Sequence, residues 1–67
     1  MKNSLKVERA KKDMTQAELA KLVNVSRQTI NAIESGDYNL STILALKISK
    51  VFQVNVNDIF LLEAKDL

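Results

Sequence analysis

Four polar side chains that suit the edges of DNA bases lie close together in this sequence: Arg27, Gln28, Thr29 and Asn31. Arginine can donate two hydrogen bonds to guanine, glutamine can pair with the N6 and N7 edge of adenine, and threonine offers a hydroxyl or methyl contact. Solvated helix faces more often carry Lys and Glu, so this choice of forked and amide groups favours base recognition. The alternative is the polar start of an ordinary exposed helix.

The segment before these residues favours DNA recognition. Thr15 and Glu18 have the spacing of a capping box, which predicts the start of one helix. Ser26 is the predicted cap of the next helix, over residues 27–35. The turn at residues 24–26 is so short that the two helices must cross at a steep angle. The second helix is then able to present one face to a partner.

The whole chain, residues 1–67, is expected to be a single domain of the all-α class, a compact five-helix bundle with a helix-turn-helix at residues 15–36. Further helices are predicted over residues 4–12, after a Ser41 cap, and briefly from Asn55. Asn24 and Gly36 stand where a left-handed backbone would end a helix. The predicted buried stripes are Leu19, Leu22 and Val23; Ile30 and Ile33; and Leu44, Ile48, Val51 and Phe52.

Composition argues against several classes of protein. The 67 residues include no histidine and no cysteine, and no glycine-rich phosphate loop is present, so we expect no enzyme, no metal site and no cofactor. No apolar run approaches the roughly 18 residues that span a bilayer, and the N-terminus lacks the apolar region of a secretory signal. We therefore expect a cytoplasmic protein with no membrane partner, and we find no evident site for a small-molecule effector.

Charge is distributed unevenly along the chain. Residues 1–27 carry seven basic and three acidic groups, a net +4, whereas residues 28–67 carry three basic and five acidic groups, a net −2. An electropositive N-terminal half could face phosphates. A merely solvated helix surface explains the same pattern equally well.

The sequence resembles the phage repressor and Cro family of helix-turn-helix regulators, also called the xenobiotic-response-element-like family. The resemblance rests on TQAELA, VSRQTI, IESG and LALKISKVFQV, and it extends from about Leu5 to Phe60. It implies a lambda-repressor-like bundle, with room for a short C-terminal strand, that binds double-stranded DNA. In that family the third helix enters the major groove and the second crosses the backbone above it.

The resemblance also assigns individual residues. It implies base contacts from Arg27, Gln28 and Thr29, with Asn31 nearby, and phosphate contacts from Gln16, Ser26, Tyr38 and Asn39. Gln16 would in addition brace the first base reader. Arg9 and Glu34 match a largely buried salt bridge with a structural role. Asp13, Asn24 and Gln53 stand where the family often has glycine, and Gln53 is the poorest fit to a left-handed backbone.

A homodimer is expected because one helix-turn-helix contacts only about half of a site. Ile59, Phe60, Leu61 and Leu62 form an apolar cluster in the segment of about residues 55–67, which we assign to dimerisation. The alternative is that these residues close the core of the monomer. The predicted function is a transcriptional regulator, most simply a repressor on a pseudo-palindromic operator. An antitoxin-like protein-interaction module, whose DNA binding is secondary, is the alternative from another class.

Overall fold

The computed structural model describes residues 1–37 and 39–67, and in that part of the chain it contains five α-helices and two short strands. The helices are α1 (Leu5–Lys11), α2 (Gln16–Val23), α3 (Arg27–Glu34), α4 (Thr42–Phe52) and α5 (Val56–Ile59). The strands are β1 (Lys2–Asn3) and β2 (Phe60–Leu61), and a 3-10 helix follows at Ala64–Asp66. The predicted five-helix bundle is confirmed, and so is the short C-terminal strand.

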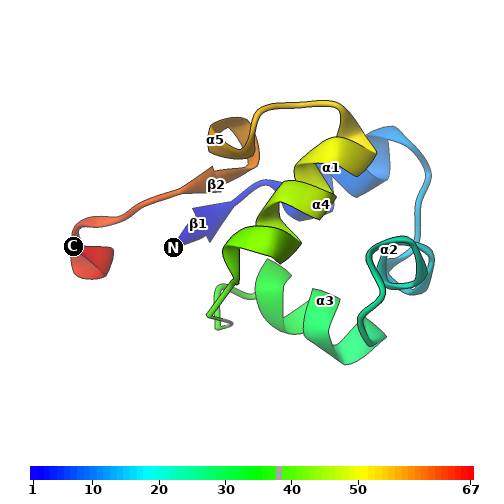
Figure 1. Cartoon of the computed structure of the whole chain (residues 1–67), viewed down its shortest axis with the longest axis horizontal. Coiled ribbons are helices and arrows are strands. Elements are labelled where there is room, and N and C mark those ends of the chain that lie inside the picture. The colour runs from blue at the N-terminus through cyan, green and yellow to red at the C-terminus, as the bar shows by residue number, and fades with distance from the viewer. Residues whose placement is uncertain (38) are drawn as a thin grey trace.

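The two strands pair with each other in an antiparallel sheet, Lys2 opposite Leu61 and Asn3 opposite Phe60. The backbone N–H of Ser4 extends this contact by donating to the carbonyl of Ile59 at 2.9 Å. The sheet lies at the end of the molecule that carries both termini, and α2 lies at the other end (Figure 1). The sequence did not predict β1, because a strand of two residues is too short to show an alternating pattern.

Three helices begin at the residues that the sequence predicted. The Thr15 hydroxyl accepts from the Glu18 backbone N–H at 3.0 Å, and the Glu18 carboxylate accepts from the Thr15 N–H at 2.9 Å, so the capping box is complete. Ser26 and Ser41 cap α3 and α4 in the same way, each through its hydroxyl. These caps satisfy backbone donors that have no partner inside a helix.

Among the residues that the structure describes, three that are not glycine adopt a left-handed backbone: Asp13 at φ 50°, Asn24 at φ 61° and Gln53 at φ 55°. They are the positions at which glycine was expected from the family resemblance, and Gly36 is left-handed as well, at φ 81°. Asn24 and Gln53 end α2 and α4 respectively. Asparagine and aspartate tolerate this conformation better than glutamine does, so Gln53 is the most strained of the three.

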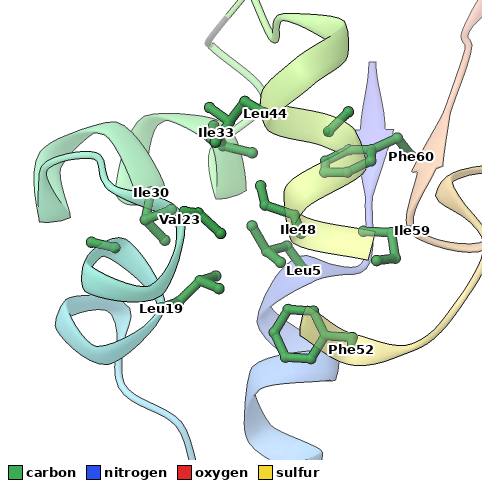
Figure 2. Close-up of a cluster of buried hydrophobic side chains, with 12 residues drawn as sticks. Leu5, Leu19, Val23, Ile30, Ile33, Leu44, Ile48, Phe52, Ile59 and Phe60 are labelled. Atoms are coloured by element: carbon green, nitrogen blue, oxygen red, sulfur yellow. The ribbon is translucent and has the colours of Figure 1, made fainter. Parts of the chain in front are cut away.

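Apolar side chains from every helix meet in one core (Figure 2). Leu5, Leu19, Ile30 and Ile48 have no exposed surface, and Ile59 is 1% exposed. The predicted stripe of α2 needs one correction, because Leu22 is 61% exposed. The buried side of α2 is formed by Leu19, Ala20 and Val23, and a residue one position before Val23 points about 100° away from it.

Candidate nucleic-acid interface

The first turn of α3 presents polar side chains to solvent. Arg27, Gln28 and Asn31 are exposed, and their spacing of one, three and four residues places them on one side of the helix start. Thr29 is half-buried, and its hydroxyl lies 3.0 Å from that of Ser26. The structure therefore brings the four predicted base-contacting residues together, with Thr29 the least accessible of them.

The opposite side of α3 is anchored in the core. Ile30 is fully buried and Ile33 is 2% exposed, and both face the other helices in Figure 2. Val25, in the turn between α2 and α3, is partly buried against the same core. Because α3 is fixed from behind and through its connecting turn, its exposed side chains project from a rigid helix and not from a loop.

An ion pair between α1 and α3 lies close to this surface. The Arg9 guanidinium donates two hydrogen bonds to the Glu34 carboxylate. Nε donates to Oε2, and Nη2 donates to Oε1 at 3.0 Å. Arg9 Nη1 donates to the carbonyl of Met14 at 2.7 Å. The Arg9 and Glu34 side chains are only 13% and 7% exposed. The pair joins the first helix to the end of α3 and holds the latter in place.

Charge and hydrogen bonding keep both members of the pair ionised. Burial raises the pKa of the Glu34 carboxyl, but hydrogen bonds from Arg9 and Gln16 outweigh it, so the pKa lies below its ordinary value. The hydrogen bond to Glu34 raises the pKa of Arg9 in turn. Each group is thus stabilised in its charged form by its partner.

Gln16, the first residue of α2, connects this ion pair to the surface of α3. Its side-chain nitrogen Nε2 donates to Glu34 Oε1 at 3.0 Å and to Asn31 Oδ1 at 3.2 Å. The family resemblance implied that Gln16 braces the first base reader, Arg27; in the described part of the chain its hydrogen-bond partner among the predicted readers is Asn31 instead. The contact spans 15 residues and depends on the angle between α2 and α3, which no local pattern shows.

Three of the four predicted phosphate-contacting residues lie in the described part of the chain, and Gln16, at the start of α2, is one of them. Ser26 lies at the start of α3, and its hydroxyl is used for capping. Asn39 is exposed in the segment that follows the helix. Tyr38 lies outside the described residues. Ser26 and Asn39 are separated along the chain by all eight residues of α3, a helix about 12 Å long, so we expect each of them to contact a different phosphate.

The C-terminal apolar cluster divides into an inner and an outer half. Ile59 and Phe60 are buried in the monomer, at 1% and 8% exposure, whereas Leu61 and Leu62 are exposed. Two further exposed apolar residues, Ile43 and Leu46, lie one turn apart on α4 and were not singled out from the sequence. The signal for them was present, because α4 carries more apolar residues than a single buried stripe can use.

The described residues contain no cluster of three or more His, Cys, Asp or Glu side chains that could hold a metal ion. Within residues 1–37 and 39–67, no helix has the length and apolar character to cross a bilayer.

Comparisons with known proteins agree with this geometry. The family described as "Helix-turn-helix" matches residues 5–59. An HTH-type transcriptional regulator of Methanocaldococcus jannaschii is 56% identical over 63 residues, which cover 94% of this chain and 96% of the relative. The HTH-type transcriptional regulator YgzD of Bacillus subtilis is 47% identical over 66 residues, 98% of this chain and 100% of the relative. Among solved structures, the restriction-modification controller protein C.AhdI from Aeromonas hydrophila has a TM-score of 0.76 at 27% identity, covering 84% of this chain and 85% of that one.

Proposed function

The chain belongs to the helix-turn-helix family of DNA-binding transcriptional regulators, and on that premise we propose that it is a repressor that binds a pseudo-palindromic operator as a homodimer through α3 in the major groove. The family is one of transcription regulators and not of enzymes. Binding to the operator would exclude the polymerase from an overlapping promoter.

The observation that carries the proposal is the contrast between the two sides of α3. Arg27, Gln28 and Asn31 are exposed at its start, while Ile30 and Ile33 fix its other side in the core. A major groove about 12 Å wide accepts a helix about 10–12 Å across, and the N-terminal residues of such a helix reach the base edges. Ser26 and Asn39 would fix the register through phosphates, whereas both side-chain N–H donors of Gln16 are already used by Glu34 and Asn31.

A homodimer is proposed because one copy of α3 offers too few base readers for a specific site. Leu61 and Leu62 follow α5 at the end of the molecule that carries the termini, away from α2 (Figure 1). Leu62 also lines a groove of about 270 Å³ together with Leu40, Leu46, Val56 and Phe60. We assign the occupant of this apolar surface to a second copy of the chain, which a two-fold operator requires. The inner residues Ile59 and Phe60 would support the interface from within the monomer.

Selection from a randomised duplex library at two salt concentrations tests the DNA proposal. We expect enrichment of a two-fold symmetric site whose half-sites are about 34–36 Å apart. The Arg27→Ala/Gln28→Ala variant should lose the enrichment. Lys50→Ala is the matched control, because it removes one positive charge from an exposed side chain of α4, outside the predicted DNA contacts and outside the segment assigned to dimerisation. Weak binding that falls steeply with salt and enriches no sequence would contradict base recognition and leave only phosphate attraction.

The sign of regulation needs a second measurement. A reporter gene whose promoter overlaps the selected site should be expressed less when the protein is present. The same reporter with a scrambled site is the control. An increase in expression would contradict the repressor proposal while leaving the DNA proposal intact.

A further inference from the structure

We propose that Asn31 reads guanine, because the Arg9–Glu34–Gln16 hydrogen-bond relay turns its side-chain amide so that only donors face the DNA; the inference rests on the proposed function. An asparagine whose amide turns freely prefers adenine, because it can then donate to N7 and accept from N6 at the same time. In this structure the oxygen of Asn31 is turned toward Gln16, so it is directed away from the N6 group of an adenine.

The relay begins at a group whose hydrogen-bonding direction is fixed. A carboxylate can only accept, and Glu34 is held ionised by the forked contact from Arg9. Gln16 must therefore turn its NH₂ group and not its oxygen toward Glu34, to which Nε2 donates at 3.0 Å. The orientation of an amide follows from its partners, and here the partner allows one choice.

The same NH₂ group then fixes Asn31. Gln16 Nε2 donates its other hydrogen to Asn31 Oδ1 at 3.2 Å. This hydrogen bond turns the oxygen of Asn31 toward Gln16, and because the amide is planar its Nδ2, with both hydrogens, forms the opposite arm of the group. Asn31 is exposed and lies one helical turn from Arg27 and Gln28, and we therefore assign those hydrogens to the side on which the other readers meet the DNA.

Two adjacent donors fit the edge of guanine, which presents O6 and N7 as acceptors in the major groove. Adenine offers one acceptor at N7 beside its own N6 donors, so the outward NH₂ group of Asn31 would meet another NH₂ group there. Gln16 is thus a positioning residue: it sets what Asn31 can recognise without touching the base itself.

Library selection with Gln16→Ala and Asn31→Ala tests this assignment, with wild-type protein run beside them. The base pair whose preference disappears in Asn31→Ala identifies the position that Asn31 reads. At that position wild-type protein should prefer guanine to adenine by about tenfold, since one such contact contributes roughly a factor of ten. In Gln16→Ala the amide can turn over, so the preference should move to adenine at this position only. Gln28→Ala is the matched control: it should lose selectivity at its own base pair and keep guanine at that of Asn31.

The result would overturn the inference in any of three ways: adenine is preferred by the wild-type protein at the Asn31 position, guanine is retained there in Gln16→Ala, or no position responds to Asn31→Ala. Each of these outcomes is compatible with an enriched symmetric site and therefore leaves the proposed function standing. If no sequence is enriched at all, the proposed function and this inference fall together. Thermal melts of both variants show whether a loss of binding reflects unfolding. A change of base preference at a single position cannot result from unfolding.

Discussion

Replacing Glu34 with alanine should strongly destabilise the protein. The carboxylate accepts from two nitrogens of Arg9 and from Gln16, and the side chain is 7% exposed. Glu34→Ala leaves the Arg9 charge, itself 13% exposed, with the Met14 carbonyl as its remaining partner among the described residues. Removing one member of a buried ion pair costs about 3–5 kcal/mol, because the other charge stays buried without compensation.

That loss is large compared with the stability of so short a chain. A domain of 67 residues has a free energy of unfolding of roughly 3–10 kcal/mol at about 0.05–0.15 kcal/mol per residue. Each kcal/mol corresponds to about 4–8 °C in the melting temperature of such a domain, so Tm should fall by at least about 12 °C. Urea titration and thermal melting followed by circular dichroism measure both quantities.

Two further variants keep the reasoning testable if Glu34→Ala does not fold. Glu34→Gln retains the volume of the side chain and should lose less stability than the alanine variant. Arg9→Met/Glu34→Leu removes both charges together and should recover most of the loss, since apolar pairs of similar volume replace buried ion pairs well. A free energy of unfolding for Glu34→Ala within about 1 kcal/mol of wild type would refute the assignment of this pair to structural stability.

Three other predictions follow from the structure. The pKa of Glu34 is depressed in the folded state, so its contribution to stability is present above the ordinary glutamate pKa of about 4.3 and is lost as pH falls through the folded value. Acid titration of the wild-type protein and of Glu34→Gln checks this, and identical acid midpoints would contradict it. Gln53→Gly should stabilise the protein by about 0.5–1 kcal/mol in urea titration by relieving a left-handed glutamine, whereas Asn24→Gly should be nearly neutral; a destabilised Gln53→Gly would contradict the strain argument. In sedimentation velocity, Leu62→Glu should change the mass of the protein from that of a dimer to that of a monomer. Leu22→Glu on α2, where the side chain is also exposed, should not; an unchanged mass for Leu62→Glu would argue against the proposed interface.

The features of the fold that could be predicted are those with a local chemical cause. A helix begins after each of Thr15, Ser26 and Ser41 because the hydroxyl accepts from a backbone N–H in its first turn. A sequence of a few residues is enough to show such a cap. The left-handed backbone of Asn24 at the end of α2 was expected on the same grounds. The cap at Ser26 and the glycine at Gly36 predicted both ends of α3. With those ends known, Arg27 and the polar residues beside it were expected to lie together at its start.

The features that could not be predicted depend on contacts between distant segments. The side-chain amide of Asn3 donates to the carbonyl of Ile33 at 2.8 Å across 30 residues, and nothing near Asn3 in the sequence indicates that partner. Four consecutive apolar residues ending in Leu62 likewise do not show where the chain turns outward. Only the end of α5 and the alternation of β2 place Ile59 and Phe60 inside and leave Leu61 outside.

The small sheet has a consequence for the order in which the protein opens. Its two strands are separated by nearly the whole sequence, so they can meet only after the helices between them have packed, and loop closure makes such contacts late to form. Strands of two residues also hold few hydrogen bonds, so this sheet should be an early site of local unfolding. Because Asn3 also holds a carbonyl near the end of α3, each such opening would loosen that end of the helix. Amide hydrogen exchange at β1 and in the last turn of α3 should then occur on a common timescale. DNA bound by α3 would slow exchange at β1 as well.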